Sequence, residues 1–140
     1  MSKINWGRIL LGGIVATTVN IPLALAFNSR YVLGPLHDKE IKALGAVPPQ
    51  NLLFLWPLYF LLGGIALIWL YAAARPRFGP GAKTAVKTAL GCWFIGVAMP
   101  NFENVLAGRF SARLMLSGSL IALVGMTVAS IAGAAVYKEA

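Results

Sequence analysis

The chain has little charge, a single cysteine and a single histidine, and these shortages exclude several kinds of chemistry. Charged residues make up 11% of its 140 residues, against about 25% in an ordinary soluble domain. One cysteine, Cys92, allows no disulfide and no dithiol redox cycle within one chain. One histidine, His37, does not provide the two axial ligands that a haem-carrying bundle usually needs.

Acidic residues are also scarce, and all of them lie outside the apolar stretches: Asp38, Glu40, Glu103 and Glu139. A small proton-coupled antiporter needs an ionisable carboxylate inside a membrane span. That class is therefore excluded unless Glu103 is drawn inward. The cluster of His37, Asp38 and Glu40 is better explained as a solvated surface group than as a metal site.

The sequence contains no set of residues that points to catalysis. No Ser/His/Asp arrangement and no Gly-rich loop after a strand is present. We therefore expect no catalytic residues, no cofactor and no bound metal, and the protein is not predicted to be an enzyme.

Apolar residues, in contrast, make up 59% of the chain. They form four long stretches: Gly7–Phe27, Leu52–Ala74, Lys83–Asn101 and Leu114–Tyr137. Each is close to the ~20 residues that a helix needs to cross a bilayer, and the second and fourth have no polar face of the kind a soluble bundle shows. The sequence predicts an all-α fold: one integral membrane domain over residues 1–140, built as a four-helix transmembrane bundle.

The basic residues indicate the orientation of this bundle. They lie as pairs at helix ends, which is typical of topology signals and not of a nucleic-acid surface. The side that holds both termini would carry Lys3, Arg8, Arg75, Arg77, Lys83, Lys87 and Lys138, and the other side Arg30, Lys39, Lys42, Arg109 and Arg113. The excess predicts that both termini of this multi-pass protein lie in the cytoplasm.

Two of the four spans have an alternative interpretation. The first resembles a signal peptide, with Lys3 and Arg8 before an apolar core and a possible cleavage site at Ala24–Ala26; cleavage would leave three spans. The third has Lys83 and Lys87 in its first turns. We favour a full crossing in which these lysines reach the headgroups, with a re-entrant loop as the alternative.

The longer connections between spans predict short helices on the membrane surface. Helical spacing of apolar residues in Asn28–Asn51 ends at Gly45. In Asn101–Arg113, Asn101 is a candidate N-cap and Glu103 would pair with Arg109. These two elements form a candidate lid over one end of the bundle. Between the second and third spans, Arg75–Gly81 predicts a tight turn.

Small residues at steps of three or four indicate where the helices pack closely. Lipid tails are as apolar as leucine, so helices associate where small residues let their backbones approach. A candidate packing seam is formed by Gly13 of the first span and by Gly118, Ala122, Gly125, Ala129 and Gly133 of the fourth.

One polar spot interrupts the first span. It consists of Thr17, Thr18, Asn20 and Pro22. The proline removes a helix hydrogen bond and predicts a kink, and the asparagine needs a partner because hydrocarbon offers none. The group is either an interhelical hydrogen-bonding site or a notch that binds a ligand, since broken helices often line such sites.

Three segments carry a resemblance to a known group: Ile4–Gly13, Trp69–Gly81 and Ala132–Glu139. They resemble the helix ends and turns of small uncharacterised bacterial membrane proteins of about this length. The resemblance implies a four-span architecture in the bacterial inner membrane and carries over no catalytic residues.

These observations lead to two functional hypotheses. The first is a non-catalytic protein that acts through helix packing, either as an accessory or assembly subunit of a membrane complex or as a homo-oligomer. The alternative is a transporter or binder of a small apolar or amphiphilic molecule that uses the notch in the first span. The expected partners are the lipid bilayer and a membrane protein or a second copy, with no nucleic acid.

Overall fold

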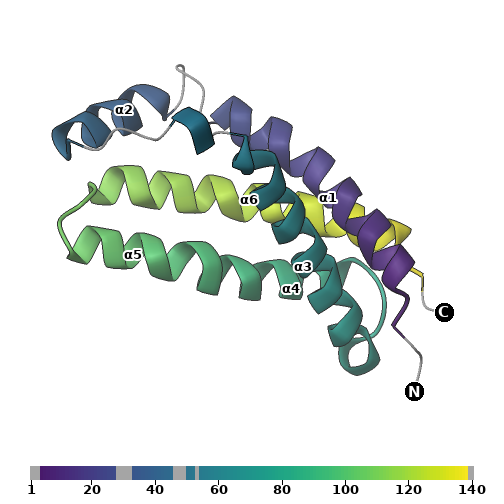
Figure 1. Ribbon diagram of the computed structural model, residues 1–140. Helices are drawn as coiled ribbons and strands as arrows, with labels where there is room; N and C mark the ends of the chain where they lie inside the picture. Colours follow the sequence, from purple (N-terminus) through teal and green to yellow (C-terminus); the bar gives the residue numbers. More distant parts are fainter. Residues whose placement is uncertain (1–3, 28–32, 46–49, 53, 139–140) are drawn as a thin grey trace.

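The computed structural model describes residues 4–27, 33–45, 50–52 and 54–138, and within these ranges it is helical with no strand. Figure 1 shows the helices, which are α1 (Trp6–Phe27), α2 (Gly34–Ala43), the 3-10 helix η1 (Gln50–Leu52), α3 (Leu55–Phe78), α4 (Ala82–Trp93), the π-helix η2 (Phe94–Ala98), α5 (Met99–Leu106) and α6 (Ala112–Val136). The predicted all-α class is confirmed.

Three helices in the described ranges are long and apolar enough to cross a membrane, namely α1 over Trp6–Ala26, α3 and α6. They coincide with three of the predicted spans and indicate a membrane protein. The remaining predicted span, 83–101, lies in α4, η2 and α5, which follow one another without a gap from Ala82 to Leu106. Because the π-helix divides this rod, no α-helix within it has the length of a span, and the fourth crossing stays a prediction.

The turn expected over Arg75–Gly81 begins later than predicted. Helix α3 continues through Pro76 to Phe78 and ends at Gly79, whose φ of 79° suits a residue without a side chain. Pro76 does not stop the helix here, and the last turn is closed by the Gly79 amide, which donates to the Arg75 carbonyl at 2.8 Å. The turn itself is therefore Gly79–Gly81.

Asn101 is not an N-cap, because it lies inside α5. The ring of Pro100 would collide with the carbonyl of Gly96 in a regular α-helix. The wider turn of η2 removes this collision, so the helix runs on to Leu106. The N-cap of the last helix is Ser111, whose hydroxyl accepts from the Leu114 amide at 3.2 Å.

The helices are joined firmly at the end where both termini lie (Figure 1). Here the buried hydroxyl of Thr84 donates to the Gly79 carbonyl at 2.7 Å, and the Gly81 amide donates to the Tyr71 hydroxyl at 3.0 Å. Ser130, fully buried on α6, donates to the Ala85 carbonyl of α4 at 2.9 Å. These bonds fix α3, α4 and α6 to one another. We call this the closed end.

Close helix crossings are made by glycines. A Cβ on Gly133 of α6 would lie 2.6 Å from the Gly12 carbonyl oxygen of α1. A Cβ on Gly13 would lie 2.7 Å from the Cα of Ile65, on α3. Because these neighbours are largely backbone, α1 is held against both α3 and α6 at distances that no side chain permits.

Candidate functional site

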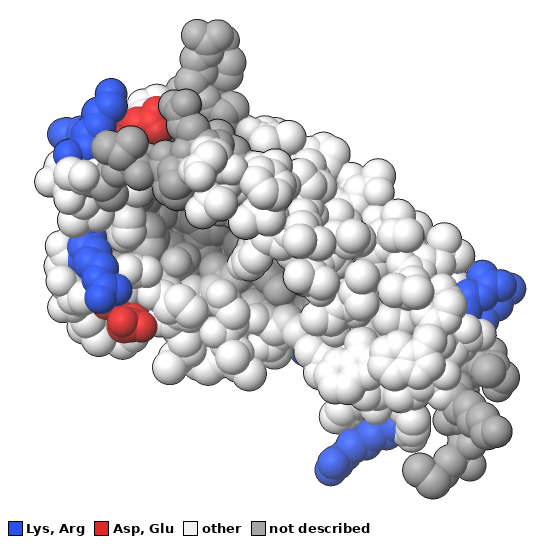
Figure 2. Space-filling view, viewed as in Figure 1, with Lys and Arg blue, Asp and Glu red and all other residues white. Residues whose placement is uncertain are grey.

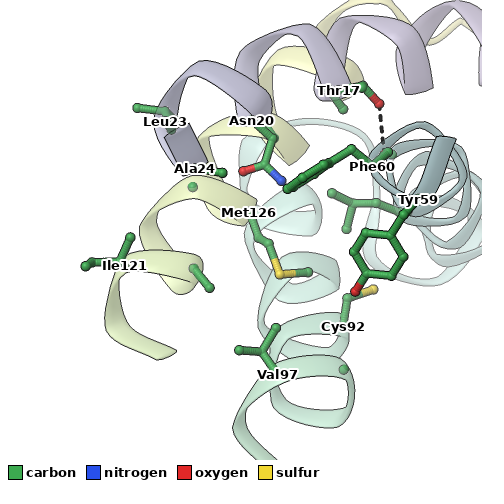
Figure 3. Close-up of a pocket in the computed structure, with 18 of the residues that line it drawn as sticks. Thr17, Asn20, Leu23, Ala24, Tyr59, Phe60, Cys92, Val97, Ile121 and Met126 are labelled. Atoms are coloured by element: carbon green, nitrogen blue, oxygen red, sulfur yellow. Dashed lines mark hydrogen bonds between the residues drawn. The ribbon is translucent and has the colours of Figure 1, made fainter. Parts of the chain in front are cut away.

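A pocket of about 310 Å³ lies among the helices, away from the closed end. Residues of α1 and α3 form one side, and residues of α4, η2 and α6 form the other (Figure 3). None of the described residues that line it is charged. Figure 2 shows a hollow in one face of the molecule, and on that face the Lys, Arg, Asp and Glu side chains gather at the two ends.

The structure brings two of the four predicted notch residues to this pocket. Thr17, which is 8% exposed, lines it and donates to the Phe60 carbonyl of α3 at 3.1 Å. Asn20 also lines it. Thr18 is exposed and donates within α1 to the Ile14 carbonyl at 2.9 Å. Pro22 is exposed inside α1 and does not line the pocket.

The Asn20 carboxamide is a polar group of this pocket to which no described residue bonds, and the Tyr59 hydroxyl is another. The carboxamide occupies the space left by Gly125 of α6, where a Cβ would lie 2.8 Å from the Asn20 Oδ1. The absence of a side chain at Gly125 therefore makes room for the carboxamide at the pocket wall (Figure 3).

The predicted packing seam on α6 is divided between two roles. Gly125, Ala129 and Gly133 are buried, and Gly133 forms the crossing with α1 described above. Gly118 and Ala122 line the pocket, and a Cβ on Gly118 would meet nothing within 4 Å. Gly13, on α1, packs against α3. Gly125 and Ala129 line the pocket as well. The seam on α6 therefore borders the pocket from Gly118 to Ala129, and only Gly133 serves packing alone.

The wall opposite α1 contains the π-helix. Gly96 and Val97 of η2 line the pocket together with Cys92 of α4. Trp93, just before η2, donates from its indole nitrogen to the Ser119 carbonyl of α6 at 2.7 Å. This bond ties the wide turn of the π-helix to α6, and π-helices are often found at functional sites.

None of the three predicted lid residues lines the pocket. Asn101 ties α5 to α6, because its side-chain amide nitrogen donates to the Ser119 hydroxyl at 2.8 Å. Glu103, in α5, and Arg109, in the turn after it, form an exposed ion pair at 3.7 Å.

Helix α2 lies at the far end of the molecule from the termini (Figure 1), and none of its residues lines the pocket. The residue before it, Leu33, lines the pocket, and no residue of α2 is buried. Its Glu40 carboxylate accepts from the Ser111 amide at 2.8 Å and from the Ser111 hydroxyl at 2.5 Å. Two hydrogen bonds to one residue at the start of α6 thus hold α2 in place.

This attachment is expected to depend on pH. The hydrogen bonds from Ser111 lower the pKa of Glu40 from its ordinary value of 4.5, because they favour the charged carboxylate. The attachment is then complete above pH 4.5 and is lost as the pH falls through the lowered pKa. In an NMR titration, the Ser111 amide resonance should move with a midpoint below 4.5. A Glu40→Gln variant should show no such step, and a midpoint at or above 4.5 would contradict the contact.

Sequence reasoning missed most of the pocket. Tyr59, Phe60 and Met126 line it, and nothing in the sequence distinguishes them from other apolar residues of their spans. The missed N-cap had a signal, since Ser111 directly precedes the last apolar stretch.

The described residues do not form a site for metal chemistry. They contain no group of three His, Cys, Asp or Glu side chains that could hold a metal ion. His37 pairs only with its exposed neighbour Asp38, at 3.7 Å. No family model, no curated protein and no solved structure matches the chain, so its function has to be inferred from its own geometry.

Proposed function

We propose that the chain is a multi-pass membrane protein that binds a small amphiphilic molecule in the pocket between its helices. The observation that carries this proposal is the pocket of about 310 Å³, whose largely apolar walls include a few polar side chains, Thr17, Asn20 and Tyr59. Ligand pockets usually have volumes of about 300–1,000 Å³, apolar walls and a few polar groups that orient the ligand.

The proposed topology has four crossings, with the α4–η2–α5 rod as the third in chain order. Both termini and the closed end then lie in the cytoplasm of a bacterium, where the excess of basic residues belongs. The pocket and α2 lie toward the opposite face of the inner membrane. A molecule from the bilayer reaches the pocket from the side, between α3 and the rod, where Tyr59 and Val97 line opposite walls (Figure 3).

The packing hypothesis receives less support from the same residues. It relied on small residues that would be free to meet a partner. Gly125, Ala129 and Gly133 are buried within the chain, so they are not free to meet a partner. The binding hypothesis is favoured because Gly118, Ala122, Gly125 and Ala129 all line the pocket.

The test compares two glycines that both have open space around them. Gly118→Leu places a side chain in the pocket, whereas Gly91→Leu places one on an exposed surface that does not line it. Each variant is purified in nanodiscs made from the source membrane and weighed by native mass spectrometry. We expect a bound amphiphile in the wild type and in Gly91→Leu. In Gly118→Leu the new side chain overlaps with the ligand, so we expect at least a five-fold lower occupancy, which corresponds to a loss of about 1 kcal/mol of binding free energy.

Two results would count against the proposal. One is a wild-type protein that carries no small molecule at all. The other is equal occupancy in the wild type and both variants, which would place the ligand elsewhere. If the wild type instead keeps a second protein at fixed stoichiometry, the packing hypothesis takes the place of the binding one.

A further inference from the structure

The pocket walls restrict the charge of what they can hold. None of the described lining residues is an acid or a base, so none of them would supply a counter-ion to a charged group inside the pocket. Moving a charge from water into an apolar site without a partner is costly, and the group neutralises or stays outside. The part of the ligand within the pocket is therefore uncharged.

The same walls contain two polar groups to which no described residue bonds, the Asn20 carboxamide and the Tyr59 hydroxyl. Thr17, beside Asn20 in the pocket, already donates to the Phe60 carbonyl. The carboxamide has two donor hydrogens and an acceptor oxygen. Asn20 is partly buried, whereas Tyr59 is 66% exposed, so Asn20 is the inner group to which a ligand in the pocket would bond.

Depth in the membrane supports the same conclusion. Asn20 lies seven residues before Phe27, where α1 ends, which is about 10 Å along the helix axis. In the proposed topology this depth lies in the hydrocarbon region of the bilayer, below the headgroups, where lipid offers no hydrogen-bond partner to an amide. An ionic headgroup would have to leave the water and counter-ions of the membrane surface to reach Asn20. An uncharged headgroup does not carry this cost.

We infer that the bound amphiphile enters the pocket with an uncharged hydroxyl or carbonyl group, which hydrogen-bonds to the Asn20 carboxamide, while its apolar part contacts the helix walls. The ligand class is therefore a neutral lipid, such as a long-chain alcohol. This inference rests on the proposed function and adds to it the chemistry of the ligand.

Cys92 provides a direct readout. It is the one cysteine in the sequence, and it lines the pocket across from Asn20 (Figure 3). The rate of its reaction with N-ethylmaleimide is measured on the full chain in nanodiscs. The lipid contains dodecanol, dodecyltrimethylammonium or dodecyl phosphate at the same mole fraction, so only the head group differs.

The variants are Asn20→Ala and, as the matched control on the same helix, Thr18→Ala, which lies outside the pocket. We expect dodecanol to slow the labelling of Cys92 in the wild type and in Thr18→Ala. In Asn20→Ala this protection should fall about five-fold, as the loss of one hydrogen bond predicts. The two charged amphiphiles should give little protection in any of the three proteins.

Two results would overturn the inference, and they can be told apart. If the charged amphiphiles protect Cys92 as well as dodecanol does, or if Asn20→Ala is protected like the wild type, the head group assignment is wrong and the pocket still binds amphiphiles. If none of the three amphiphiles slows the reaction, the proposed function fails together with the inference.

Discussion

Replacing Gly133 with leucine is expected to separate α1 from α6 and to prevent stable folding. A Cβ at this position would lie 2.6 Å from the Gly12 carbonyl oxygen and 2.6 Å from the Cδ1 of Ile68. The side chain of Ile68 is fully buried and cannot move aside without disturbing the core. Overpacking by one methylene costs about 1–3 kcal/mol, so a whole leucine should lower the free energy of unfolding by about 3 kcal/mol or more.

The matched control is the same change at Gly118, on the same helix. A Cβ there meets nothing within 4 Å, so Gly118→Leu should fold like the wild type, with at most a small change in stability. The free energy of unfolding of both variants is measured in mixed micelles with increasing SDS. Equal stability of the two proteins would show that α1 and α6 do not cross at Gly133.

The second large effect is expected for Gly64→Ala on α3, and it should be absent when the adjacent glycine, Gly63, is replaced instead. A Cβ on Gly64 would lie 2.6 Å from the Gly13 carbonyl oxygen and would collide with the Thr17 hydroxyl. Gly64→Ala should therefore push α1 away, weaken the bond from Thr17 to the Phe60 carbonyl, and lower the free energy of unfolding by about 2 kcal/mol.

Gly63→Ala is the control, because a Cβ at Gly63 meets nothing within 4 Å. Alanine favours a helix over glycine by up to about 1 kcal/mol, so this variant should be as stable as the wild type or slightly more. Thermal unfolding of the wild type and both variants in one detergent ranks their stabilities. A destabilised Gly63→Ala, or an unchanged Gly64→Ala, would contradict the packing of α1 on α3.

Much of the helical architecture could be predicted because the apolar stretches are long and charges mark their ends. The stretch at Gly7–Phe27 matches α1 to within a residue at its start. The errors lie where a rule about proline was applied too strictly. Pro76 and Pro100 both lie inside helical segments, one near a helix end and the other after a π turn. Neither circumstance can be recognised from residue types alone.

The candidate site could be predicted only on one of its walls. Thr17 and Asn20 are conspicuous because they are polar residues in an apolar stretch. Tyr59 and Met126 are ordinary residues of their spans, and they reach the pocket only because of how α3 and α6 cross α1. The position at which two helices cross depends on which glycine lies against which segment of backbone. The sequence shows where the glycines are, but it does not show which helix each of them contacts.

The hydrogen bonds along α6 have a mechanical consequence. Helix α6 has 25 residues and is about 37 Å long. Ser130 bonds it to α4 near one end, Ser119 bonds it to the α4–η2–α5 rod farther along, and Ser111 bonds to α2 just before its start. Helix α6 therefore acts as a splint that holds α4, η2 and α5 as one rigid wall. Because α3 has few contacts with η2 or α5, a change in the width of the pocket requires α3 to move relative to this wall.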